Sequence, residues 1–94
     1  MKMISIEFNH NGITYHAIVR CKCASGAEEY HVTIMNGTLE MQLYGYHVFV
    51  MRDNRLTPLR SCENKSIVPI RDSVATGLAK YLQSTAAEPV PSGA

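Results

Sequence analysis

The residues best suited to chemistry in this sequence are its three cysteines and four histidines. Cys21 and Cys23 are separated by a single lysine, and Cys62 stands alone further along the chain. Thiolates can bind a soft metal ion, but zinc sites usually present pairs of cysteines with roughly two to four residues between them. An odd number of cysteines also does not suit a framework of disulfide bonds. We therefore expect reduced thiols with no metal or other cofactor, and a small Cys/His metal or thiol site is kept as an alternative.

Three of the histidines fall on the same side of the predicted strands. His16, His31 and His47 all have this parity, and a histidine cluster could bind a metal or respond to pH. In the predicted pairing, however, Glu7 lies opposite His16 and Gln42 lies opposite His31, so these two histidines have ordinary cross-strand partners. A structural role is therefore the favoured interpretation.

Motifs for catalysis and for nucleic-acid binding are weak or absent in the sequence. It contains no Gly-x-Ser-x-Gly, no glycine-rich phosphate loop and no paired-carboxylate motif, so we expect no enzymatic activity. A net charge of +1 gives no strong field that would attract nucleic acid or an anionic membrane. Arg52, Arg55 and Arg60 could form a nucleic-acid-binding loop, but acidic residues interrupt them. This loop is the second alternative.

The sheet that must position these residues is predicted most clearly between residues 30 and 51. Asn36-Gly37 lies between two alternating segments and favours a type I′ turn. In that register Ile34 faces Leu39, and both segments direct their apolar residues to the same face. The strands predicted here are residues 30–35, 38–43 and 47–52.

A first hairpin is predicted from residues 3–9 and 13–20, with Asn11-Gly12 as its turn. Its register pairs apolar residues on one face: Phe8 with Tyr15, Ile6 with Ala17, and Ile4 with Val19. Residues 21–28 are interpreted as the connection to the next strand, and residues 56–59 as a short edge strand because they contain Pro58.

A helix follows from Pro69, where the apolar spacing changes. Its apolar stripe consists of Ile70, Val74, Leu78, Tyr81 and Leu82. Gly77 borders this stripe, either because the helix approaches the sheet closely or as a tolerated defect. Residues 85–94 contain two prolines and no pattern, so we predict a single domain over 1–84 and a disordered tail. The predicted fold is α+β, an antiparallel β-meander of five to six strands with one C-terminal amphipathic helix packed on one face.

The face of the sheet without the helix is the predicted functional surface. Strand parity places Ile18, Met35, Phe49 and Met51 there, which makes the face more apolar than solvation requires. We therefore predict a small non-enzymatic module that binds another protein or assembles with itself, with a homodimer as the simplest form. The sequence contains neither a stretch of about 20 apolar residues nor a secretory signal pattern, so we expect a cytoplasmic location and no membrane partner.

Overall fold

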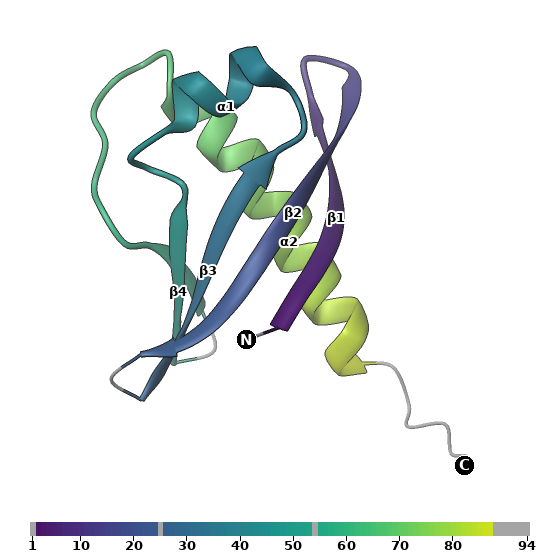
Figure 1. Ribbon diagram of the computed structural model, residues 1–94, viewed down its shortest axis with the longest axis vertical. Coiled ribbons are helices and arrows are strands. Elements are labelled where there is room, and N and C mark those ends of the chain that lie inside the picture. The colour runs from purple at the N-terminus through teal and green to yellow at the C-terminus, as the bar shows by residue number, and fades with distance from the viewer. Residues whose placement is uncertain (1, 25, 54, 88–94) are drawn as a thin grey trace.

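The computed structural model describes residues 2–24, 26–53 and 55–87 of the chain. Its elements are β1 (Lys2–His10), β2 (Ile13–Ala24), β3 (Ala27–Ile34), α1 (Gly37–Leu43), β4 (Val48–Arg52), β5 (Arg55–Pro58) and α2 (Val68–Ala87). The five strands form one antiparallel sheet in chain order, and this sheet curls along α2 (Figure 1). The predicted α+β meander with a C-terminal helix is therefore confirmed.

The first hairpin has the predicted register. Phe8 pairs with Tyr15 and Ile6 with Ala17, and the residues that close the turn are His10 and Ile13. Both central turn residues, Asn11 and Gly12, have positive φ, as a type I′ turn requires. Turn chemistry and alternation agree here, so this hairpin follows from local sequence alone.

The second hairpin is longer than predicted. Strands β2 and β3 pair as far as Ala24 and Ala27, so most of residues 21–28 belong to the ladder instead of a connection. Gly26 has a φ of +79° at this turn. Cys21 and Cys23 consequently lie on a strand.

The segment predicted as the strand 38–43 is the helix α1, and the predicted turn at Asn36-Gly37 is wrong. Asn36 has extended backbone and caps the helix, because its Oδ1 accepts a hydrogen bond of 3.1 Å from the Leu39 N–H. Glu40 Oε1 accepts another, of 2.8 Å, from the N–H of Ile34. The predicted pair of Ile34 and Leu39 therefore does not form.

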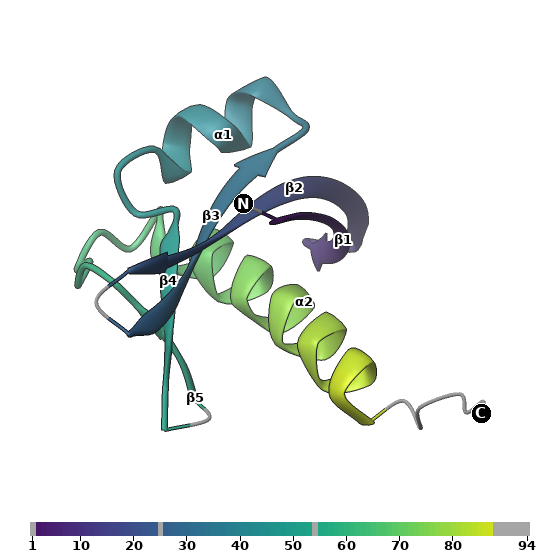
Figure 2. The same cartoon turned by 60° about the horizontal axis from the view of Figure 1, so that its bottom comes forward.

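The apolar residues of α1 fit a helix as well as a strand. Leu39 and Leu43 are four residues apart, so both lie on the helix face that packs into the core. Met41 is 80% exposed, whereas a strand would have placed it beside them. Because α1 replaces the predicted strand, β3 pairs with β4 instead. Figure 2 shows α1 at the end of β3 and α2 beneath β1 and β2.

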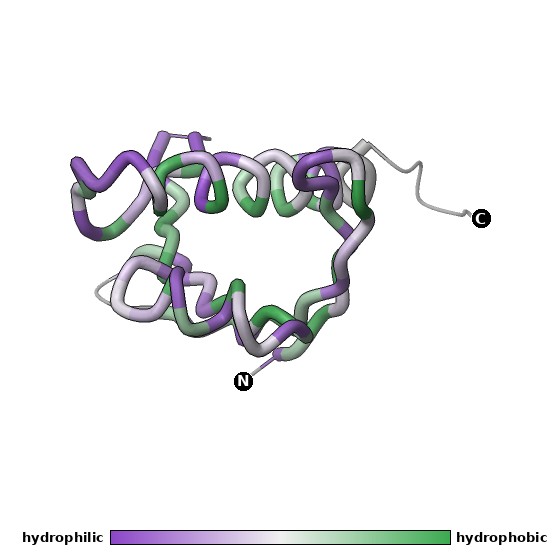
Figure 3. The backbone as a smooth tube through the Cα atoms, turned by 90° about the horizontal axis from the view of Figure 1, so that it is seen from above, coloured by the Kyte–Doolittle hydropathy of each residue, from purple (hydrophilic) through white to green (hydrophobic). Residues whose placement is uncertain are grey.

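Helix α2 buries the predicted stripe. Ile70, Val74 and Leu78 are buried in the core, and Tyr81 and Leu82 pack against its margin. The helix continues to Ala87, three residues beyond the predicted end of the domain at residue 84. The rest of the predicted tail, residues 88–94, lies outside the described residues. In Figure 3, α2 and the sheet lie on opposite sides of the space that the core side chains fill.

Gly77 marks the closest approach of α2 to β1. A Cβ atom at this position would lie 2.6 Å from the carbonyl oxygen of Glu7 and 2.7 Å from Cβ of Phe8. Real Cβ atoms are not found so close to such neighbours, so the glycine lets the helix contact the strand backbone directly. Of the two interpretations of Gly77, close approach is therefore confirmed.

Candidate protein-binding surface

The structure places the four predicted surface residues on both sides of the sheet. Phe49 pairs with Tyr30 across β3 and β4, and both are buried in the core on the α2 side. Met51 packs against the same core. The predicted position on the helix-free face is therefore wrong for Phe49 and Met51, whereas Ile18 and Met35 lie on the side without α2.

The error arises from the parity of β4. If residues 38–43 were a strand, β4 would pair with them, and Val48 and Val50 would point into the core. In the structure β4 pairs with β3, and Val48 and Val50 lie opposite His31 and Glu29 on the other side. A shift of one position moves every side chain of a strand to the opposite face.

We call the side of the sheet opposite α2 the outer face. Alternation with the buried residues of β1, β2 and β3 identifies the side chains that it carries. In register, three rows span all three strands: Met3, Arg20 and His31; Ser5, Ile18 and Thr33; and Glu7, His16 and Met35. The pair of Lys22 and Glu29 continues the face at one end, and the pair of Asn9 and Thr14 continues it at the other.

Apolar residues form a diagonal across these rows, with Ile18 at the centre. Met3 and Met35, at its two ends, are 62% and 63% exposed, and Ile18 is half-buried. Diagonal neighbours on adjacent strands are about 7–8 Å apart, within reach of long side chains. The predicted surface omitted Met3, although its parity in the first hairpin already placed it on this face.

Acidic side chains and histidines lie on either side of this diagonal. Glu7 Oε2 lies 3.8 Å from His16 Nδ1, and both side chains are about two-thirds exposed, so the predicted pair forms but is solvated. His31 Nε2 lies 3.0 Å from Glu29 Oε1. The predicted partner of His31, Gln42, is instead on α1.

His47 connects α1 to the outer face. Its ring stacks on Tyr44 at 5.8 Å and lies 6.4 Å from the ring of His31, measured between centroids. The Gly45 N–H donates to His47 Nδ1 at 3.2 Å, so the imidazole acts as an acceptor there. Burial lowers the pKa of His47; Glu40 opposes this shift, and His31 and Arg20 add to it.

Acidification should therefore weaken the fold through His47. Because its folded-state pKa lies below its ordinary value of 6.5, the unfolded chain binds more protons, and stability is lost as the pH falls from about 6.5 through the folded-state pKa. We expect the His47→Asn variant, which retains an acceptor near the Gly45 N–H but does not titrate, to lose less stability than the wild type between pH 7.5 and 5.5. Urea unfolding at both pH values measures this, and an equal loss in both proteins would contradict it.

Cys21 and Cys23 lie on the α2 side of β2, whereas Cys62 lies between β5 and α2. Cys21 pairs with Tyr30 and is buried, while Cys23 pairs with Glu28 and is exposed. Burial raises the pKa of the Cys21 thiol, Glu28 raises it further and Lys2 lowers it, which leaves a poor nucleophile. Within residues 2–24, 26–53 and 55–87, no group of three or more His, Cys, Asp or Glu could hold a metal ion. The geometry thus gives no support to the metal alternative.

The three arginines of the nucleic-acid alternative do not share one surface. Arg52 and Arg55 face each other across the turn between β4 and β5. The Arg60 guanidinium lies 5.4 Å from the centre of the Tyr46 ring and donates to the Gly45 carbonyl oxygen at 3.3 Å, near the opposite end of β4. A strand rises about 3.3 Å per residue, so β4 separates the two groups by roughly 16 Å.

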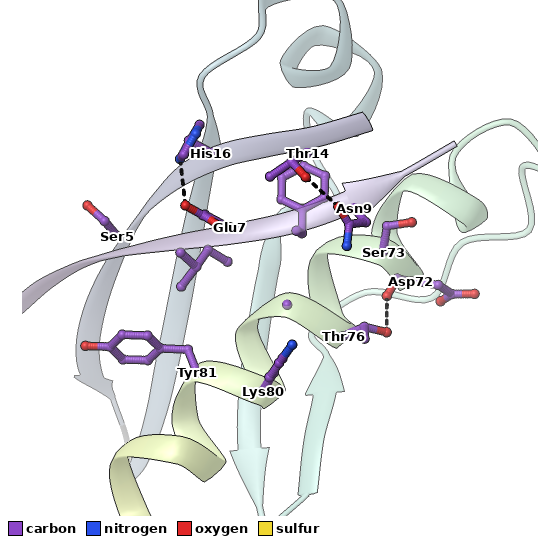
Figure 4. Close-up of a pocket in the computed structure, with 13 residues that line it drawn as sticks. Ser5, Glu7, Asn9, Thr14, His16, Asp72, Ser73, Thr76, Lys80 and Tyr81 are labelled. Carbon is purple, nitrogen blue, oxygen red and sulfur yellow. Dashed lines mark hydrogen bonds and ion pairs between the residues drawn. The ribbon is translucent and has the colours of Figure 1, made fainter. Parts of the chain in front are cut away.

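A groove of about 790 Å³ borders the outer face between β1 and α2 (Figure 4). Several of its polar groups bond within the protein: Thr14 donates to Asn9 at 2.7 Å, and Thr76 donates to the Asp72 carbonyl oxygen at 2.9 Å. Glu7 and His16 belong both to this groove and to the outer face. We therefore treat the groove as the margin of the outer face.

Comparison of the chain with family models, with curated proteins and with solved structures gave no match. Among the described residues, no helix is both long enough and apolar enough to cross a membrane. The geometry of the outer face is therefore the observation from which function is argued.

Proposed function

We propose that this chain is a small non-enzymatic module that binds another protein molecule through the outer face. The observation that carries the proposal is the diagonal of Met3, Ile18 and Met35, whose two ends are more than half exposed. Burying a side chain of this size is worth roughly 1.5 to 3 kcal/mol, so a complex in which a partner covers the diagonal is stabilised by the removal of these side chains from water. We place this function in the cytoplasm, where the exposed thiol of Cys23 would stay reduced.

The surroundings of the diagonal also suit a protein partner. Polar and charged side chains surround it, including Arg20, Glu7 and His16. An apolar centre within a polar rim is typical of protein interfaces. The nucleic-acid alternative has less support, because Arg60 is held by Tyr46 and Gly45.

A double variant tests the proposal. Met3→Glu with Met35→Glu places two charges on exposed positions of the outer face, so the fold should remain intact by circular dichroism. We expect chemical cross-linking in cells, followed by mass spectrometry, to recover the bound protein with the wild-type chain, and at least tenfold less of it with this variant.

The matched control changes apolar residues elsewhere. Ile13→Glu with Leu59→Glu introduces the same two charges at positions that are 54% and 46% exposed and lie outside the three rows. Ile13 closes the turn of the first hairpin, and Leu59 bonds to Val48, two strands beyond β3. We expect this control to retain the wild-type cross-links. If both double variants recover the same protein as the wild type, the outer face is not the binding surface and the proposal fails.

A further inference from the structure

We propose that the partner of the outer face is a second copy of this chain, which packs face to face about a two-fold axis along the Met3–Ile18–Met35 diagonal. This inference rests on the proposed function and names its partner. In a two-fold contact the same patch serves both copies, so each side chain on the axis meets its own counterpart. A patch suits such a contact only if residues of like charge do not meet across the axis.

Charge disfavours the other arrangements of the three rows. Four directions of a two-fold axis through Ile18 in the plane of contact set the positions of the three rows directly against one another: along the strands, across them and along the two diagonals. An axis along the strands sets Arg20 against Arg20 of the second copy, and an axis along the other diagonal sets Glu7 against Glu7. An axis across the strands sets Met3 against Glu7 of the second copy and Met35 against His31. Like charges in contact, or charges buried against apolar groups, disfavour all three.

The remaining axis gives a self-complementary contact. Met3, Ile18 and Met35 each meet the same residue of the second copy, which forms a continuous apolar seam. Glu7 meets His31 of the second copy at both ends, a pairing of acidic and basic side chains. The apolar groups are thus covered, and among the nine positions no like charges are opposed. Glu29, which bonds His31 within the same chain, lies one row beyond this contact.

The size of the patch predicts a weak dimer. The nine positions of the three rows span roughly 300 Å², from the strand spacing and the rise per residue. A stable interface buries about 800 Å² on each partner. The outer face also lies on the outside of the curl of the sheet, which limits the contact to the region around Ile18 (Figure 2). We therefore expect weak association, with the dimer fraction rising only at high protein concentration.

Sedimentation equilibrium of the full chain, from about 20 µM to about 2 mM, tests whether the dimer forms in this range. We expect the mean mass to rise with concentration towards that of a dimer. Met3→Glu with Met35→Glu should weaken this association at least tenfold, whereas Ile13→Glu with Leu59→Glu should not change it. A dimer unaffected by the first variant would use another surface and would overturn the inference.

Cross-linking of single cysteines tests the direction of the axis. In a chain carrying Cys23→Ser and Cys62→Ser, Met35→Cys lies on the axis, so two copies face each other at about the 10 Å spacing of packed sheets. Glu7→Cys lies at a corner away from the axis. It is roughly 17 Å from its counterpart when measured along the sheet, and roughly 19 Å when the spacing between the two sheets is included. A bis-maleimide that spans about 10 Å should link Met35→Cys to itself and should not link Glu7→Cys. The reverse result would overturn the inference.

The two proposals fail on different results. A chain that is monomeric at about 2 mM and gives no Met35→Cys dimer overturns self-association. If Met3→Glu with Met35→Glu still loses a cross-linked protein in cells, and that protein is not this chain, the proposed function stands with a different partner.

Discussion

Replacing Phe49 with alanine is expected to destabilise the domain by about 3 to 5 kcal/mol, the range for removing a buried aromatic ring. Phe49 has an exposure of 0% and lies in the core on the α2 side, where it pairs with Tyr30. A domain of this kind has roughly 5 to 15 kcal/mol of stability, so the loss is a large part of the total. Urea unfolding followed by circular dichroism measures it.

The Phe49→Glu variant sharpens this prediction. It places an unpaired carboxylate in the core as well as removing the ring, so we expect no cooperative unfolding transition at all. Met35→Ala is the control: its side chain is mostly exposed on the outer face, and its change should stay within about 0.5 kcal/mol. A folded Phe49→Glu protein would mean that Phe49 is on the outer face and would contradict the structure.

Replacing Gly77 with alanine is expected to cost about 1 to 2 kcal/mol, although alanine is the better helix former. Alanine gains up to about 1 kcal/mol in helix propensity, while overpacking costs about 1 to 3 kcal/mol. Overpacking should prevail because the added Cβ would lie 2.6 Å from the backbone oxygen of Glu7, which cannot move unless β1 moves with it. Thermal and urea unfolding measure the difference from the wild type.

Thr76→Ala is the matched control for Gly77, one residue earlier on α2. Thr76 is exposed and its hydroxyl donates to the Asp72 carbonyl oxygen within the same helix. Alanine at position 76 should leave stability within about 0.5 kcal/mol of the wild type, or raise it slightly. A Gly77→Ala protein that is more stable than the wild type would show that α2 does not press on β1.

Local sequence determined the first hairpin and α2 without reference to the rest of the chain. The Asn11-Gly12 turn, with its closing pair of His10 and Ile13, sets the register, and the period of two then assigns every side chain of β1 and β2 to a face. This register correctly places Ile18 on the outer face, and it places Met3 on the same face. The period of α2 likewise identified its buried stripe, because a helix of this length repeats the signal several times.

For the segment that follows β3, the local sequence fits a strand and a helix equally well. Leu39, Met41 and Leu43 alternate as in a strand, while Leu39 and Leu43 alone are spaced as in a helix. Asn36 serves equally well in a turn and as a helix N-cap. A stretch of seven residues is too short for either period to exclude the other. The structure decides through packing, because as a helix the segment buries Leu39 and Leu43 in the core and leaves Met41 in water.

The face to which Phe49 points depended on that choice. If residues 38–43 formed a strand, that strand would be the neighbour of β4. Because they form α1, β4 pairs with β3 instead. Phe49 then lies opposite Tyr30 and points into the core, as Tyr30 does. By itself the sequence determined the fold class, the first register and the buried face of α2, because turn geometry and repeated periods act over a few neighbouring residues. Only the tertiary structure decided the identity of α1 and the parity of β4, and with them which apolar residues remain on the outer face, because strand pairing is settled by contacts between distant parts of the chain.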